Sequence, residues 1–294
     1  MLADIPIYVV NLDRSPERLQ AIAEQLAQMG MSFKRVSGVD GKTSSLEREL
    51  FSGRASLSNV PKQSLTREEI GCHLSHLKTF DEILASGVAS AIILEDDLII
   101  SPSFRSAAVA LAGRFSGEPV VIKLEPWRKP RLAYMVHRCG DFDLIFTNHQ
   151  LTQTAAYFIT AEAIRLLRTP LSRIDRPYDD SLYAARENGV GILSLSPAIA
   201  QQTASFQSLI ETGRRRLRDR GRRYGLTREI IRPISQCAQF LSLLRVIKIK
   251  FGWQGLINLR WHRPARLDRP PQSMGNFTGL SEGATCAGTE RVAR

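Results

Sequence analysis

Short apolar runs and stretches of helical periodicity alternate along the first part of the chain. Residues 5–10 form an apolar, β-branched run that predicts a buried strand. Ser15 and Pro16 are a favourable N-cap and first-turn pair for a helix that keeps its apolar spacing until Gly30. Residues 33–36 predict a second strand. This order of strand, loop, helix and strand is typical of the start of a parallel sheet.

The pattern continues with a loop, a long helix and a third strand. Residues 41–64 are rich in Ser, Gly and charge and predict a long loop. Thr66 and Glu69 have the spacing of a capping box, so a helix should run from there to about Ser86. A short buried strand is then expected at residues 91–94. Further strands are predicted at residues 120–124 and 190–195, and further helices at residues 161–167 and 181–188.

Net charge divides the chain into unequal parts. The formal net charge is +11, yet residues 1–210 carry 22 Lys+Arg and 23 Asp+Glu, whereas residues 211–294 carry 18 and 6. We therefore expect a neutral globular domain at 1–210 and a basic, amphipathic helical extension at 211–262. A disordered tail rich in Pro, Gly, Ser and Thr should follow at 263–294. Nucleic acid is an unlikely partner for a body of this charge.

Targeting signals and cysteine usage favour a cytoplasmic location. The N-terminus has no basic region followed by an apolar core, and no apolar stretch reaches the length of a membrane span. The four cysteines are scattered, as expected in a reducing compartment. Seven of the ten residues in 214–223 are arginine. With the semi-apolar segment 230–253, they predict peripheral docking on an anionic membrane, on the inner face of the cytoplasmic membrane. A solvated, flexible connector is the alternative.

The strongest candidate for chemistry is the acidic run that ends the strand at 91–94. Glu95, Asp96 and Asp97 would repel one another at the end of a buried strand, where α/β proteins bind ligands. Carboxylate oxygens suit a hard divalent cation that also binds substrate phosphates. The alternative is a solvated acidic turn.

Two other clusters carry weaker signals. Asp175, Asp179 and Asp180 could supply a metal ligand or a general base, or could simply favour the first turn of a helix. Cys72 and His76 are metal-capable, but no second Cys/His group completes a zinc set, and a packed or hydrogen-bonding His76 is expected. The turn after the first strand has no glycine, which excludes a dinucleotide fingerprint.

Six segments together resemble glycosyltransferase family 25. They read VVNLDR at 9–14, FKRVSGVDG at 33–41, EIGCHLSH at 69–76, ILEDD at 93–97, TAAYFIT at 154–160 and SPAIAQ at 196–201. Each is weak alone, but their order and spacing are those of the family. The segment 98–153 matches poorly, so its role is undefined and analogy is least safe there.

The resemblance implies a GT-A-type fold, that is, a Rossmann-like, mostly parallel sheet flanked by helices. It also implies transfer of a hexose, galactose by the best-known members, from a UDP-sugar with inversion. The acceptor would be a saccharide or lipid-linked saccharide of the lipooligosaccharide or lipopolysaccharide core, or of another cell-surface glycan. A metal-dependent phosphoester-cleaving enzyme, or a non-catalytic protein that binds anionic surfaces through the arginine-rich tail, remains the alternative.

The same resemblance suggests roles for individual residues. Asp97 and Glu95 would hold Mn²⁺ or another divalent cation at the donor diphosphate. Asp179 or Asp180 would be the catalytic carboxylate that takes the acceptor proton. The donor would be contacted by Asn11, Arg14, Arg18, Glu95 and Asp96. For the two arginines, a surface ion pair with Asp13 or Glu17 is the alternative.

Overall fold

A computed structural model describes most of the first two-thirds of the chain and a few residues near its end. The described residues are 5–43, 45–51, 55–57, 65–112, 114–115, 117–126, 131–146, 151–184, 189–203, 241, 244–245, 248, 252–253 and 256–262. The arginine-rich run at 214–223 and the predicted tail at 263–294 lie outside them. In the described part, no helix has both the length and the apolar character needed to cross a membrane.

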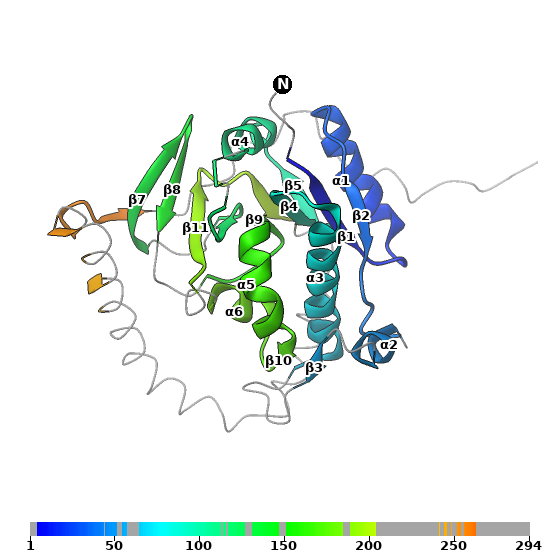
Figure 1. The fold of residues 1–294 in the computed structure, drawn as a ribbon. Helices are drawn as coiled ribbons and strands as arrows, with labels where there is room; N and C mark the ends of the chain where they lie inside the picture. The colour runs from blue at the N-terminus through cyan, green and yellow to red at the C-terminus, as the bar shows by residue number, and fades with distance from the viewer. Residues whose placement is uncertain are drawn as a thin grey trace, which may run out of the picture.

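One nine-stranded sheet forms the centre of the molecule (Figure 1). Its strand order is β13-β7-β8-β11-β6-β9-β4-β1-β2. The strands are β1 (Ile7–Asn11), β2 (Lys34–Ser37), β4 (Ser90–Glu95), β6 (Val120–Lys123), β7 (Arg131–Cys139), β8 (Phe142–Phe146), β9 (Ala156–Thr160), β11 (Gly191–Ser196) and β13 (Arg260–His262). The pairings make β8, β9 and β13 run opposite to the other six strands. Two small sheets pair β3 (Ser56–Leu57) with β10 (Arg173–Ile174), and β5 (Leu98–Ile100) with β12 (Ala200–Gln202).

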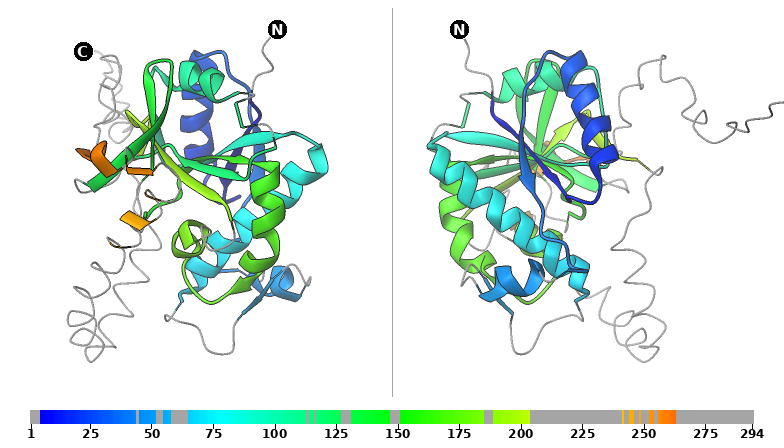
Figure 2. Two further views of the ribbon diagram at one scale, coloured as in Figure 1. Left: turned by 60° about the vertical axis from the view of Figure 1, so that its left-hand side comes forward. Right: turned by 90° about the vertical axis from the view of Figure 1, so that its right-hand side faces the viewer.

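Helices pack on both faces of the sheet (Figures 1 and 2). They are α1 (Pro16–Gln28), α2 (Ser45–Phe51), α3 (Arg67–Ser86), α4 (Phe104–Leu111), α5 (Ala161–Leu171) and α6 (Tyr178–Tyr183). One apolar core lies between the sheet and α3, α5 and α6, and a second lies between the sheet and α1 and α4. Tyr8 and Ile93 point into the first core, whereas Val9 and Ile92 point into the second, because successive side chains of a strand alternate between faces.

This architecture confirms the predicted fold class. The sheet is α/β, six of its nine strands share one direction, and helices flank it. Local signals also placed several elements correctly. The Thr66 side chain accepts from the Glu69 amide while the Glu69 side chain accepts from the Thr66 amide, and Gly87 ends α3 in the left-handed conformation. Gly71 is needed where α3 crosses a loop, since a Cβ there would lie 2.5 Å from the Val39 carbonyl oxygen.

Two predictions of secondary structure were wrong in detail. The segment 41–64, expected to be a loop, contains α2 and β3. The helix expected at 181–188 begins earlier, at Tyr178, because the two aspartates occupy its first turn. Within the predicted extension 211–262, the described residues include β13, which pairs with β7 and lengthens the main sheet. Tertiary pairing, and not local pattern, determines the strands β3 and β13.

Candidate functional site

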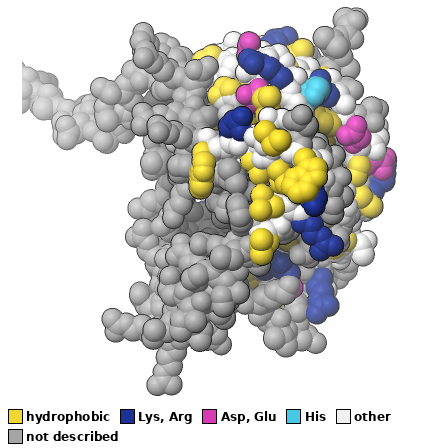
Figure 3. Space-filling model, turned by 90° about the vertical axis from the view of Figure 1, so that its left-hand side faces the viewer, with side chains coloured by type: hydrophobic (Ala, Val, Ile, Leu, Met, Phe, Trp, Pro, Cys, Tyr) yellow, Lys and Arg dark blue, Asp and Glu magenta, His cyan; other side chains and the backbone are white. Residues whose placement is uncertain are grey.

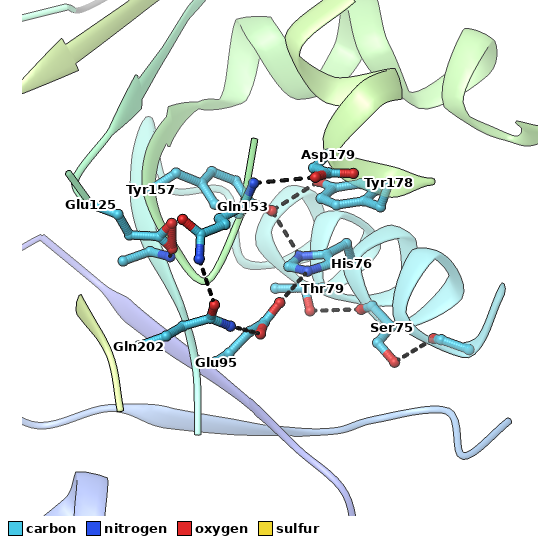
Figure 4. A network of polar contacts seen from close by, with 12 residues as sticks. Ser75, His76, Thr79, Glu95, Glu125, Gln153, Tyr157, Tyr178, Asp179 and Gln202 are labelled. Atoms are coloured by element: carbon cyan, nitrogen blue, oxygen red, sulfur yellow. Dashed lines mark hydrogen bonds and ion pairs between the residues drawn. The ribbon is translucent and has the colours of Figure 1, made fainter. Parts of the chain in front are cut away.

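Polar side chains gather at one edge of the main sheet (Figure 4). Asn11 and Glu95 are the last residues of β1 and β4, and Glu125 lies just beyond β6. The antiparallel strand β9 begins at the same edge, so Gln153, just before it, also lies there. Helix α3 brings His76 to this edge, and α6 brings Asp179. Ligands of open α/β sheets bind at such an edge.

Four carboxylates, those of Glu95, Asp97, Glu125 and Asp179, gather at the end of β4. We call this group the acidic side. Burial, followed by the nearby charges of Glu125, Asp96 and Asp179, raises the pKa of Glu95 to about 8. Burial, followed by the charges of Glu95 and Asp96, likewise raises the pKa of Asp97 to about 7. These carboxyls therefore bind protons near neutral pH unless a cation enters.

Asp97 is the least satisfied of these residues. Its Oδ1 atom is buried and has no hydrogen-bond partner. The main chain around it is fixed, since the Thr203 amide donates to the Asp97 carbonyl oxygen over 2.8 Å. A buried carboxylate oxygen without a donor is costly, which points to a ligand at this position.

A buried ion pair supplies part of the missing positive charge. Lys123 is fully buried, and its Nζ atom donates to Glu125 Oε2 over 2.6 Å and to the Gln153 carbonyl oxygen over 2.8 Å. The second oxygen of Glu125 accepts from the Ala156 amide over 2.9 Å. Lys123 also lowers the pKa of Glu95, but burial and the neighbouring carboxylates outweigh it, so the charge of Glu95 is not fully compensated.

Gln153 ties the acidic groups together. It is the single non-glycine residue with positive φ, 68°, in the described part of the chain. Its amide donates to Asp179 Oδ2 over 3.2 Å, and its side chain donates to Gln202 Oε1 over 2.9 Å. Gln202 in turn donates to Glu95 Oε2 over 3.4 Å. Such backbone strain persists where surrounding contacts determine it, and it is common at functional sites.

The histidine of the EIGCHLSH segment lies beneath Glu95. His76 Nδ1 is 2.9 Å from the Tyr157 hydroxyl, which is 2.9 Å from the Tyr178 hydroxyl, and the His76 ring stacks on Tyr178 at 4.1 Å. Its other nitrogen, Nε2, is 3.6 Å from Glu95 Oε1. Burial lowers the pKa of His76 to about 3, so the ring is neutral. The prediction of a hydrogen-bonded His76 is confirmed.

On the opposite side of the same strand end, Asp96 has polar partners, although burial still raises its pKa. Asp96 Oδ2 accepts from Asn11 Nδ2 over 2.7 Å, and Asp96 Oδ1 is 3.6 Å from Arg18 Nη1. Asn11 also donates to the Ser15 carbonyl oxygen and accepts from Arg35. Asp96 is thus turned away from Asp97 and joined to the loop after β1.

The structure brings together most of the residues predicted for the site. Glu95, Asp97 and Asp179 share the acidic side, while Asn11, Arg18 and Asp96 form a separate network beside it. Arg14 pairs with Asp40 on the surface, and not with the aspartate or glutamate beside it in sequence. Asp180 follows Asp179 in the first turn of α6, where its amide donates to Asp179 Oδ1. The proposed roles of these residues toward a donor stay predictions.

Four contributors escaped the sequence analysis. Lys123 and Glu125 carried a signal, because a lysine within the apolar run 120–124 must be paired when it is buried. Gln153 and Gln202 carried none, since neither positive φ nor the meeting of residues 49 positions apart can be read from local pattern.

The donor atoms fit a hard divalent cation. Carboxylate oxygens are the ligands that Mn²⁺ and Mg²⁺ prefer, and Asp97 Oδ1 is a buried carboxylate oxygen without a partner. Glu95 and Asp97 are the residues that would hold such an ion.

Known proteins share this sequence pattern. The chain matches the sequence model of glycosyltransferase family 25 (LPS biosynthesis protein) over residues 4–182. A probable inactive glycosyltransferase 25 family member 3 from Rattus norvegicus is 32% identical over 112 residues, which are 34% of this chain and 18% of the relative. A glycosyltransferase 25 family member from Drosophila melanogaster is 33% identical over 109 residues, 36% of this chain and 18% of the relative.

Among solved structures, the chain is similar to a glycosyltransferase involved in the glycosylation of the major capsid of PBCV-1. That likeness has a TM-score of 0.38 and 9% identity, and it covers 70% of this chain and 95% of the other. Against the two animal relatives, the match spans 18% of their length. Because the family's sequence model matches more than half of the residues, from 4 to 182 of 294, the chain belongs to glycosyltransferase family 25.

Proposed function

We propose that this protein is a metal-dependent glycosyltransferase of GT-A type that moves a hexose, galactose in the first instance, from a UDP-sugar to a saccharide with inversion. The observation that carries the proposal is the uncompensated carboxylate pair, Glu95 and Asp97, at the ligand-binding edge of the sheet. Family membership makes a sugar nucleotide the natural donor. A lipooligosaccharide or lipopolysaccharide core, or another cell-surface glycan, is the acceptor class that we propose.

The residues of the site divide this chemistry among them. A divalent cation held by Glu95 and Asp97 would neutralise the leaving diphosphate. Asp179 is the better placed of the two predicted bases. Its carboxylate accepts a hydrogen bond from the Gln153 amide, and its charge raises the pKa of the nearby Glu95. As the general base, it would take the proton of the acceptor hydroxyl in a single displacement, which inverts the anomeric centre.

A screen of UDP-sugars tests the proposal. We expect release of UDP that requires Mn²⁺, is abolished by EDTA, and falls by about 10²-fold or more in Asp97→Asn. Asp141→Asn is the matched control, because Asp141 is an exposed carboxylate in the turn between β7 and β8. If UDP-sugars stay inert while phosphoesters are cleaved, the chain is the alternative phosphoesterase. If no turnover is found, it resembles the relatives named inactive.

We also propose that the protein docks on an anionic membrane from the cytoplasmic side. Residues 211–294 carry 18 Lys+Arg against 6 Asp+Glu. On the face formed by β7 and β13, apolar side chains gather beside cationic ones (Figure 3). Trp253 and Trp261 are 67% and 72% exposed, and Lys248 Nζ lies 4.3 Å from the centre of the Trp253 ring. Exposed tryptophan with adjacent lysine is typical of segments that lie at a lipid interface.

Sedimentation with lipid vesicles measures this docking. We expect the full chain to pellet with vesicles containing phosphatidylglycerol, and to pellet several-fold less after Trp253→Ser with Trp261→Ser. Leu166→Ser is the control, since Leu166 is an exposed apolar residue on α5. Equal binding of wild type to neutral phosphatidylcholine vesicles, or equal binding of the double variant, would rule out this surface.

A further inference from the structure

We propose that Cys72, His76 and Glu95 form a second cation site, suited to a soft divalent ion such as Zn²⁺. One ligand-capable atom from each side chain, a sulfur, a ring nitrogen and a carboxylate oxygen, lies within 4.8 Å of the other two. Cys72 and His76 are four residues apart on α3, so they share a face of the helix. The third ligand is the Glu95 carboxylate at the end of β4. Because it is neither cysteine nor histidine, the sequence search for a second Cys/His group did not find it.

The free nitrogen of His76 is the observation that points to a ligand. His76 is 1% exposed, and its Nε2 atom is buried without a hydrogen-bond partner. It faces Glu95 Oε1 at 3.6 Å, a distance too long for a hydrogen bond. The buried Nε2 atom and the carboxylate oxygen thus face each other without a hydrogen bond, an arrangement that a cation between them would satisfy.

The surroundings of His76 match those of metal-binding histidines. Such residues usually have their second ring nitrogen fixed by a hydrogen bond, which sets the tautomer. Here Nδ1 lies 2.9 Å from the Tyr157 hydroxyl, and Tyr157 is held in turn by Tyr178. The tautomer with the proton on Nδ1 donates to Tyr157 and leaves the Nε2 lone pair free for a cation.

Cys72 would bind as a thiolate after losing its proton. Burial raises the pKa of this thiol well above its usual range, and the charges of Glu95 and Asp179 add to the effect. A divalent cation reverses the local charge and deprotonates a coordinating thiol. Binding therefore breaks the S–H bond of Cys72, forms a bond between sulfur and the metal, and releases one proton to solvent.

The ligand set separates this site from the hard-cation site beside it. Sulfur and imidazole nitrogen favour zinc, whereas carboxylates alone favour manganese and magnesium. Three protein ligands leave a fourth position open, and Glu95, with a side chain 24% exposed, gives access from the acidic side. Because both sites use Glu95, zinc should compete with donor binding and inhibit transfer; this consequence rests on the proposed function.

Metal binding by the full chain tests the site directly. We expect one Co²⁺ per chain with the charge-transfer absorption of a thiolate ligand, displaced by Zn²⁺. Cys72→Ser should abolish the band, and Tyr157→Phe should weaken binding by about 10–100-fold. Cys139→Ser is the control, since Cys139 is a buried free cysteine on β7. A band that survives in Cys72→Ser, or no Co²⁺ binding by wild type, would overturn the proposal.

Alkylation of the wild-type chain gives a second test, which does not depend on a variant that could misfold. Saturating Zn²⁺ should slow the alkylation of Cys72, read by mass spectrometry, by about tenfold or more, whereas Mn²⁺ should not. An unchanged rate with Zn²⁺ would contradict the site. If Zn²⁺ protects Cys72 but no UDP-sugar is turned over, the zinc site stands and the proposed transferase fails.

Discussion

The two sides of the end of β4 have opposite electrostatic character. On the side of β1, Asp96 is paired with Asn11 and Arg18. On the side of β9, Glu95 shares its surroundings with Glu125 and Asp179, and the buried Lys123 is already paired with Glu125. Asp97 lies beside Glu95, and its Oδ1 atom has no hydrogen-bond partner. Adjacent residues of one acidic run therefore have different roles. A charge that the protein neutralises holds the fold together, whereas a charge that it leaves uncompensated is available to a ligand.

Removing the buried cation should have the largest effect. Lys123→Met leaves Glu125 as an unpaired buried charge, so the free energy of unfolding should fall by about 3–5 kcal/mol, measured by urea denaturation. Arg165→Met is the control, because it breaks an exposed ion pair with Glu162 and should cost about 1 kcal/mol or less. A loss as small as the control's in Lys123→Met would mean that the acidic side does not depend on this cation.

The two aspartates should respond to the same substitution with opposite signs. Asp96→Asn relieves a charge that burial disfavours but weakens contacts to Asn11 and Arg18; the lost contacts should dominate, so we expect a loss of about 1–3 kcal/mol at pH 8. Asp97→Asn removes a repelled charge, so we expect a gain of about 0.5–2 kcal/mol with loss of function. Urea denaturation of both variants measures the change in the free energy of unfolding. Changes of the same sign in Asp96→Asn and Asp97→Asn would contradict the distinction between the β1 side and the β9 side.

Glu95 and Asp97 should make stability decrease with rising pH, whereas the buried His76, with its lowered pKa, makes stability increase until about pH 6.5. Glu95 and Asp97 have ordinary pKa values of 4.5 and 3.8, raised in the folded chain to about 8 and about 7. Between these limits the folded state binds more protons than the unfolded state, so this stabilisation is full below about pH 4 and lost as pH rises through about 7 to 8.

We therefore expect Tm, followed by calorimetry, to fall by several degrees between about pH 6.5, above which His76 contributes no further change, and about pH 9, and to recover when Mn²⁺ is added at pH 8. The double variant Glu95→Gln with Asp97→Asn is the control and should show a flatter profile. A wild-type profile as flat as the variant's would show that the two carboxyls are not perturbed.

The smallest effect concerns the backbone of Gln153. At a φ of 68°, glycine is less strained than alanine, so Gln153→Gly should be more stable than Gln153→Ala by about 1 kcal/mol. Gln20, exposed on α1, should show the reverse order by a similar amount, since glycine weakens a helix. Thermal unfolding of the four variants tests this. If alanine proves better at both positions, Gln153 is not strained.

The parts of the fold that sequence predicted are those fixed by local chemistry. The Thr66 capping box, the Gly87 stop and the apolar run before Glu95 act within a few residues, and the structure has all three. The strand β13 depends on pairing with the distant strand β7, and no local signal predicted it. The hairpin of β7 and β8 turns at Gly140 and Asp141, a local signal that the sequence analysis did not use.

The same reason limits what could be predicted of the site. The acidic run at Glu95 was visible because three carboxylates after a buried strand need an explanation. The difference between Asp96, held by Asn11 and Arg18, and Asp97, whose Oδ1 atom has no partner, was not visible, because those contacts come from segments distant in the sequence. The link from Asp179 through Gln153 and Gln202 to Glu95 joins four segments that meet only in the folded chain.

Titration calorimetry of UDP is the most direct test of the claim that the unpaired carboxylates bind a cation together with a donor diphosphate. With Mn²⁺ present, the wild-type chain and Asp141→Asn should bind UDP equally, and with EDTA neither should bind. Asp97→Asn should lose at least about 10²-fold in affinity with Mn²⁺ present. UDP binding that is the same with EDTA as with Mn²⁺, or the same in Asp97→Asn as in wild type, would contradict the account.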